Sequence, residues 1–130
     1  MKLLDTSVIL RFLTRDDPRK AGRVKRLIFE SDEEIVVSDF VFLETVYALE
    51  RTYGLSRDEI FAQLSKMLSF RRIDIINRDI LQQALVLYKE HTVPFVDAYQ
   101  VVLGREMGAE AIYTYDPHFE KKLKFPGIEP

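Results

Sequence analysis

Four acidic residues of this chain combine a reactive side chain with a position that could gather them for chemistry. Asp5 and Asp116 follow the short apolar runs MKLL and AIYTY, whereas Glu44 and Asp97 lie inside the apolar stretches DFVFLETVYALE and PFVDAYQVVLG. Acids are common here, 21 in 130 residues, so position rather than residue type must distinguish these four. Carboxylates brought to one place are suitable ligands for a divalent metal ion.

Three of these acids also have a purely structural explanation. Asp5 and Asp116 could each cap a following helix, because aspartate is a favoured N-cap residue. Pro117 directly after Asp116 favours a helix start at that point. Asp97 could interact with the positive end of a helix that begins at Pro94, an effect worth ~0.3–1 kcal/mol. Either explanation fits the sequence at these positions.

Glu44 is harder to explain in structural terms. Its neighbours in the predicted helix 39–53 are apolar on nearly every side, which is typical of a buried helix. A buried carboxylate without a partner is costly, so it needs a cation or strong hydrogen-bond donors. Arg51, the nearest basic residue on that face, lies two turns away and is too far for an ion pair within the helix. The pattern predicts a buried acid with a functional partner.

A divalent cation would explain all four acids together. Clustered carboxylates repel one another unless a cation neutralises them, and Mg²⁺ or Mn²⁺ suits carboxylate and water ligands. A metal held in this way lowers the pKa of a bound water and stabilises charge during phosphodiester displacement, which is nuclease chemistry. Other chemistries have weak support. The chain has no cysteine, its two histidines, His91 and His118, form no Ser/His/Asp pattern, and its glycines form no phosphate loop.

Short apolar segments alternate with helical ones along the chain. Strands are predicted at 2–5, 34–37, 72–76 and 111–115, and helices at about 18–29, 39–53, 57–69, 78–91 and 94–107. Strands separated by helices predict an α/β fold, a three-layer α/β/α sandwich with a central parallel sheet, in a single domain over residues 1–130. Ligands of such sheets bind at the carboxyl ends of the strands. We therefore expect Asp5 and Asp116 at the same sheet edge.

The composition is that of an ordinary globular domain, with 47% hydrophobic and 31% charged residues. No apolar run approaches the ~20 residues of a membrane span, and the absence of cysteine permits a cytoplasmic location. The net charge of −2 argues weakly against a general nucleic-acid binder. One segment, 15–26, is nevertheless basic, and Arg19, Arg23 and Arg26 share a helical face. A solvated helix surface is the plainer interpretation.

Four motifs in order, LLDTSVILRFL, VFLETVYAL, VDAYQVVL and IYTYDPHF, resemble the PIN-domain ribonucleases, and in particular the VapC-type toxins of toxin–antitoxin systems. The resemblance covers nearly the whole chain. It implies a three-layer α/β/α fold and a Mg²⁺- or Mn²⁺-dependent endoribonuclease. The acids of the family fall on Asp5, Glu44, Asp97 and Asp116.

The resemblance also suggests roles for individual residues. We expect Asp5, Asp97 and Asp116 to bind the metal, and Glu44 to complete its shell or orient the attacking water. Ser7 and Thr114 are expected to donate hydrogen bonds to these acids without binding the metal themselves. Arg15, Arg19 and Arg23 are candidates for contacts with RNA phosphates.

Two residues depart from the family pattern. The first motif often reads Asp-Thr-Asn, and here Ser7 takes the third position, so its support of Asp5 is expected to be weaker or mediated by water. The last motif often has a second aspartate before the phenylalanine, and here that residue is His118. If that aspartate were the true ligand, the site would retain three acids. We favour Asp116 because it lies nearer the end of the predicted strand.

The partners implied by the resemblance are an RNA substrate, a cognate antitoxin protein and a second copy of the chain in a homodimer, with no membrane. Two alternatives stay open. The chain could be a PIN-like module that binds RNA or protein without cutting, or a structure-specific DNA nuclease that uses the same four carboxylates.

Overall fold

A computed structural model describes residues 1–130. The chain divides into two units, Met1–Arg78 and Asp79–Pro130. The first unit contains a three-stranded sheet and four helices, and the second contains a two-stranded sheet with the helices α5, α6 and α7. No helix is long and apolar enough to cross a bilayer.

The sheet of the first unit is parallel, as the sequence predicted. It consists of β1 (Lys2–Leu3), β2 (Ile35–Val37) and β3 (Ile73–Ile75), in the order β1-β2-β3. Leu3 pairs with Val36, which in turn pairs with Asp74. The strands are shorter than predicted. β1 stops before Asp5 because that residue already caps the next helix.

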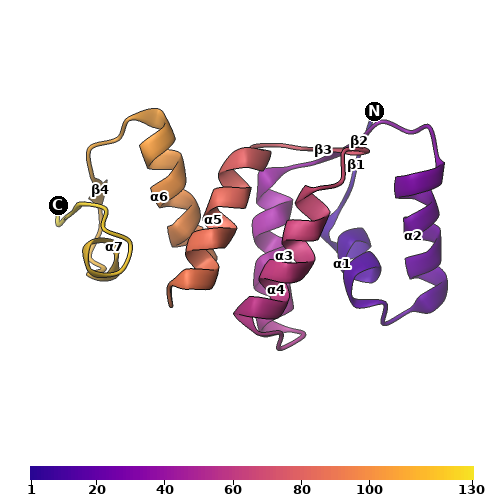
Figure 1. Cartoon of the computed structure of the whole chain (residues 1–130), viewed down its shortest axis with the longest axis horizontal. Helices are drawn as coiled ribbons and strands as arrows, with labels where there is room; N and C mark the ends of the chain where they lie inside the picture. The colour runs from indigo at the N-terminus through magenta and orange to yellow at the C-terminus, as the bar shows by residue number, and fades with distance from the viewer. The chain divides into compact units, whose positions relative to one another are not determined.

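Four helices accompany this sheet: α1 (Thr6–Thr14), α2 (Pro18–Glu30), α3 (Asp39–Arg51) and α4 (Arg57–Leu68). α1 packs against both α2 and α3, and α3 packs against α4 (Figure 1). Their starts follow local chemistry. Pro18 occupies the first turn of α2, where its missing N–H costs nothing. The hydroxyl of Ser38 accepts a hydrogen bond from the Val41 N–H at 3.1 Å and caps α3.

Helix α3 is not buried all round, and that prediction was wrong. Its inner face buries Phe42, Val46 and Leu49 completely or nearly so, but Phe40 and Tyr47 are 68% and 60% exposed. Glu44 lies on the exposed side as well. Because Phe40 and Tyr47 lie on the outer face, the sequence is apolar in every direction around the helix. In the structure the helix nevertheless has one buried face and one exposed face. Glu44 is therefore not a buried carboxylate.

The second unit contains α5 (Arg78–Glu90) except for its first residue, which is the last of the first unit. It also contains α6 (Phe95–Met107), β4 (Ile112–Tyr113), α7 (His118–Lys121) and β5 (Gly127–Ile128). α6 ends at Gly108, whose φ of 77° is the left-handed conformation that favours glycine. Gly104 lies so close to Phe125 that an added Cβ would come within 3.1 Å of its ring. This contact fixes the segment after α7 against α6.

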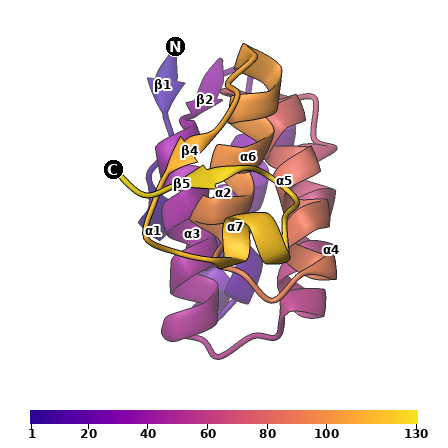
Figure 2. The same cartoon turned by 90° about the vertical axis from the view of Figure 1, so that its left-hand side faces the viewer.

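Strand β4 does not pair with the three-stranded sheet, which corrects a step of the sequence argument. It pairs in parallel with β5, and Tyr113 is opposite Ile128 (Figure 2). The sequence offered no β5, because two residues between Pro126 and Glu129 give no recognisable strand pattern. The placement of Asp116 thus cannot be inferred from a shared sheet edge with Asp5.

Candidate functional site

Asp5 lies at the junction between β1 and α1. Its carboxylate accepts hydrogen bonds from the backbone N–H of Ser7 at 3.3 Å and from the Ser7 hydroxyl at 2.7 Å. The bond from Ser7 is direct, whereas the sequence analysis expected weaker or water-mediated support. The hydroxyl, and then the backbone N–H of Ser7, hold the pKa of Asp5 below its ordinary value. Asp5 is thus a helix cap and, at neutral pH, an ionised carboxylate that is exposed to solvent.

Glu44 is held by a residue that the sequence analysis did not single out. Thr6, which is only 8% exposed, donates its hydroxyl hydrogen to Glu44 Oε1. Thr6 directly follows Asp5 in the chain. The start of α1 therefore contains one predicted acid, Asp5, as its N-cap, and the hydroxyl of the next residue binds the other acid, Glu44. The sequence feature that could have indicated this role is the hydroxyl residue Thr6 directly after Asp5 in LDTS. Glu44 therefore has a fixed position without being buried.

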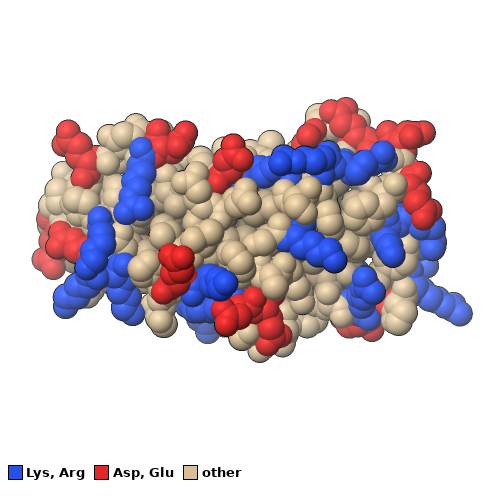
Figure 3. Space-filling model, in the orientation of Figure 1, with Lys and Arg blue, Asp and Glu red and all other residues tan.

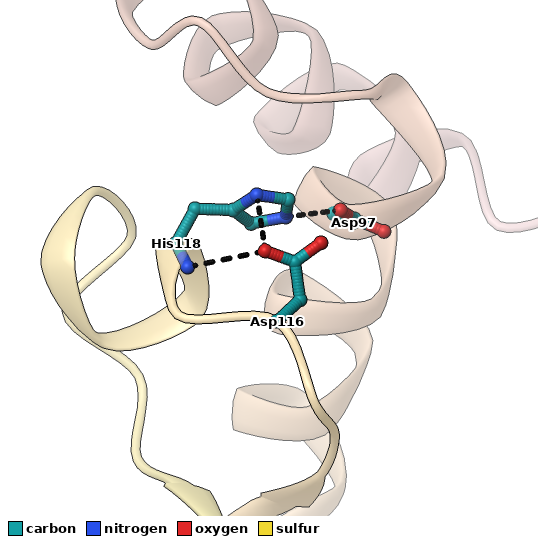
Figure 4. Close-up of side chains that lie close together, drawn as sticks. All are labelled: Asp97, Asp116 and His118. Carbon is teal, nitrogen blue, oxygen red and sulfur yellow. Dashed lines mark hydrogen bonds and ion pairs between the residues drawn. The ribbon is translucent and has the colours of Figure 1, made fainter.

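Asp97, Asp116 and His118 meet in the second unit (Figure 4). The Nε2 atom of His118 contacts Asp97 Oδ2, and its Nδ1 atom lies 2.8 Å from Asp116 Oδ1. The backbone N–H of His118 also donates to Asp116 Oδ1, at 3.3 Å. The side chains of Asp97 and His118 are 14% and 18% exposed, whereas that of Asp116 is 47% exposed. The imidazole ring therefore bridges two of the predicted site acids.

Separate elements position the members of this cluster. Asp97 lies in the first turn of α6, where the positive end of the helix favours a negative charge. Asp116 follows β4, and its backbone N–H donates to the Thr114 hydroxyl at 3.0 Å. Thr114 is itself tied to β5, because its N–H donates to Ile128 O at 2.9 Å. Thr114 thus acts on the backbone of Asp116.

His118 is the functional candidate that the sequence analysis missed. It was set aside because it forms no Ser/His/Asp pattern, and it entered only as a departure from the family motif. The useful signal was its spacing, two residues after Asp116 and at the start of a helix. That spacing lets its backbone and its ring both reach the same carboxylate.

The cluster has the donor set of a divalent cation site. One ligand atom from each of the three residues can be chosen so that all lie within 4.8 Å of one another. Two carboxylate oxygens and an imidazole nitrogen fit Mn²⁺ and related ions, and the carboxylates alone also fit Mg²⁺. The residues present therefore fit the metal that the sequence analysis expected.

The basic segment lies on α2 and at the end of α1. Arg15, Arg19 and Arg23 are exposed, and Figure 3 shows Lys and Arg side chains over the part of the view that α2 occupies. Arg15, together with Phe12 and Lys25, borders a cavity of about 260 Å³ beside the start of α2. Arg11, in contrast, is paired with Asp16 at 2.7 Å. The arginines of α2 are thus available to a charged ligand.

Comparison with known proteins identifies the family. The PIN domain family model matches residues 2–123, which is nearly the whole chain and includes all four predicted acids. The chain belongs to the PIN domain family. The three-layer α/β/α class that was predicted for this PIN domain is thereby confirmed, and its central parallel sheet is β1-β2-β3.

Two relatives of this PIN domain match along its full length. A protein named VapC ribonuclease from Aquifex aeolicus is 29% identical over 133 residues, which cover 100% of this chain and 97% of the relative. The crystal structure of VapC20 from Mycobacterium tuberculosis, described as a sarcin–ricin loop cleaving toxin, is 27% identical. It covers 100% of both chains with a TM-score of 0.43.

Proposed function

We propose that this PIN domain is a metal-dependent endoribonuclease and the toxin of a toxin–antitoxin pair. The observation that carries the proposal is the cluster of Asp97, Asp116 and His118 in a chain whose PIN family match also includes Asp5 and Glu44. Similarity to a VapC ribonuclease over the full length supports RNA as the substrate. We propose a cytoplasmic location, because the protein would meet its RNA substrate there.

In this proposal Asp5, Asp97 and Asp116 hold Mg²⁺ or Mn²⁺, and Glu44 orients the attacking water. When bound, the ion supplies positive charge that acidifies water and stabilises the phosphodiester transition state. The residues of the chain prepare for this. The hydroxyl and the backbone N–H of Ser7 lower the pKa of Asp5, and Thr6 donates a hydrogen bond to the carboxylate of Glu44.

We also propose that residues 1–130 act as one PIN-like domain with one set of catalytic acids. Support comes from the family match, which runs through both units without interruption. The exposed Arg15, Arg19 and Arg23 would bind substrate phosphates, since phosphate contacts position a nucleic acid without reading its sequence. A cognate antitoxin and a second copy of the chain are the further proposed partners.

The decisive experiment is cleavage of a mixed RNA pool by the purified protein. We expect cutting with Mg²⁺ or Mn²⁺, none in chelator, and products with 5′-phosphate and 3′-hydroxyl ends, because water is the nucleophile. Duplex and flap DNA in parallel reactions test the DNA nuclease alternative. RNA binding without cutting would favour a binding module, and 2′,3′-cyclic phosphate ends would exclude the water mechanism.

A further inference from the structure

Helix α3 presents one exposed stripe to solvent. The exposed residues of the helix are Phe40, Glu44, Tyr47 and Arg51, and its other positions are buried or half-buried. Their spacing of four, three and four residues places all of them on one face. Two of the four are large aromatic side chains, of which Phe40 is 68% and Tyr47 60% exposed. Aromatic side chains that follow one another along an exposed stripe are typical of a binding surface.

The stripe passes through one of the proposed site acids. Glu44 lies between the two aromatic residues, so each ring is about one helical turn from its carboxylate. The hydroxyl of Thr6 donates to Glu44 Oε1, which links this carboxylate to the start of α1, where Asp5 is the N-cap. A protein that covered the stripe would also cover Glu44, whereas a substrate has to reach it. The position of Glu44 therefore favours the substrate as the occupant of the stripe.

Arg51 places a positive charge at the end of the stripe. Its Cζ atom lies over the ring of Tyr47, 5.4 Å from the ring centre, a distance at which a cation attracts the face of an aromatic ring. The side chain is nevertheless exposed. A guanidinium can stack on a ring and donate its N–H groups to a phosphate at the same time. Exposed aromatic rings beside a cation are the combination by which proteins bind unpaired nucleic acid.

We propose that Phe40 and Tyr47 stack on two unpaired bases of the RNA, one on each side of Glu44, and that Arg51 contacts a phosphate of the same strand. The phosphodiester between the two bases then lies next to Glu44. The inference rests on the ribonuclease function proposed above, and it adds the residues that position the substrate.

The spacing of the two aromatic residues favours unpaired bases over a duplex. Seven residues separate Phe40 from Tyr47, which corresponds to about 10 Å along the helix axis. Bases that remain stacked on each other are only about 3.4 Å apart. A regular stack therefore cannot supply one base to each ring, whereas a strand with splayed bases can.

RNA binding in chelator tests the proposal without cleavage. The probes are a short fluorescent single-stranded RNA of mixed sequence and the same strand with abasic riboses, which keeps the phosphates and removes the bases. Phe40→Leu and Tyr47→Leu each keep an apolar side chain without the ring. Each should weaken binding of the RNA with bases by about 5- to 150-fold, the scale of one stacked base, and leave the affinity for the abasic strand unchanged.

Two further variants are the controls. Tyr113 is 74% exposed on β4, outside the stripe, so Tyr113→Leu should bind both probes as the parent does. Arg51→Gln should weaken binding of both probes and lower the logarithmic salt slope by about 0.7, the contribution of one phosphate in a single strand. An equal loss in Tyr113→Leu, or equal losses on both probes in the Phe40 and Tyr47 variants, would overturn stacking on α3.

Introduced tryptophans report stacking directly, because the chain contains none. In Phe40→Trp and in Tyr47→Trp, a base on the ring should quench the emission when RNA is added in chelator, and the abasic strand should not. Tyr113→Trp should keep its emission with both strands. Unquenched emission at both α3 positions would overturn the proposal. So would a changed oligomeric state in Phe40→Leu or Tyr47→Leu with unchanged base preference, which would make the stripe an interface between copies of the chain.

The inference and the proposed function fail separately. Chelator-sensitive RNA cleavage by a protein whose α3 variants bind both probes as the parent does would leave the ribonuclease proposal intact and reject the stripe. Base-dependent binding that is lost in the α3 variants of a protein that cleaves no RNA would retain the stripe and reject the ribonuclease.

Discussion

Thr6 donates its hydroxyl hydrogen to the carboxylate of Glu44, so the residue next to one predicted acid fixes the position of the other. Asp5 caps α1, and Thr6 is the first residue of that helix. The bond crosses from α1 to α3, two helices that pack together. An exposed glutamate of a surface helix would ordinarily sample several rotamers, and this hydrogen bond favours the rotamer in which Glu44 reaches Thr6.

The first prediction tests this contact. Thr6→Val keeps the shape of the side chain and removes the hydroxyl, so Glu44 loses its donor. We expect RNA cleavage to fall by about 10–100-fold, as for other residues that orient site groups. Unfolding free energy should drop by only about 1 kcal/mol, the net value of one hydrogen bond.

Thr45→Val is the matched control. Thr45 is fully buried on α3, and its hydroxyl donates to the Val41 carbonyl at 2.8 Å, with no acid involved. Its loss should leave cleavage near that of the parent. Equal activity losses in both variants would show a general effect of losing a hydroxyl group, not a specific hold on Glu44.

The second prediction asks whether acids of both units serve one reaction. Asp5→Asn and Asp97→Asn should each reduce cleavage strongly, and the double variant should be little worse than the poorer single one. Residues that act together in catalysis show such non-additivity. Multiplied losses would instead indicate independent contributions.

Asp58→Asn controls for charge and helix effects in that comparison. Asp58 lies in the first turn of α4 and Asp97 in the first turn of α6, although Asp58 is exposed and the side chain of Asp97 is 14% exposed. Both substitutions remove a negative charge from the positive end of a helix, a loss of ~0.3–1 kcal/mol. Asp58→Asn should retain cleavage, and its failure to do so would assign the Asp97 effect to helix stability.

The third prediction concerns the acidity of Asp5. Ser7→Ala removes the hydroxyl that contributes most to its lowered pKa, so that pKa should rise towards the ordinary value of 3.8. A carboxyl whose pKa is lowered by folding stabilises the folded state at pH values above its ordinary pKa. This contribution is lost as the pH falls through the lowered pKa. The stability difference between Ser7→Ala and the parent should therefore be present at neutral pH and fade at low pH.

Titration followed by carboxyl ¹³C NMR measures this shift directly. Asp16 is the internal reference, because its pKa is lowered by Arg11 and not by Ser7. The pKa of Asp16 should be the same in both proteins. An unmoved Asp5 would mean that the Ser7 hydroxyl does not support its charge in solution.

The fourth prediction tests the basic face of α2. Replacing Arg19, Arg23 and Arg26 by glutamine should weaken RNA binding and flatten its dependence on salt. Each phosphate contact contributes about 0.7 to the logarithmic salt slope for a single strand, so three lost contacts should lower it by about 2. Fluorescence anisotropy in chelator measures binding without cleavage.

A second triple variant, with Lys121, Lys122 and Lys124 replaced by glutamine, removes the same charge from another surface. It should change the salt slope less than the α2 variant does. Equal slopes would mean that RNA responds to net charge, and the α2 face would then be an ordinary solvated surface.

The sequence by itself determined the features that depend on local chemistry. The starts of α2 and α3 at Pro18 and Ser38, and the end of α6 at Gly108, follow from residues that satisfy or free the backbone at those points. The parallel sheet follows from short apolar strands separated by helices. The four family motifs, in order along nearly the whole chain, were likewise sufficient to predict the PIN domain correctly.

Only the tertiary structure decided what lies next to what. Exposure of Glu44 could not be read from α3, because Phe40 and Tyr47 made its outer face as apolar as its core. The pairing of β4 depended on β5, two residues that carry no strand signal of their own. His118 became a site residue because α6 and α7 bring its ring between Asp97 and Asp116, 21 and 2 residues away. Such contacts are set by packing between distant segments, and local patterns do not encode them.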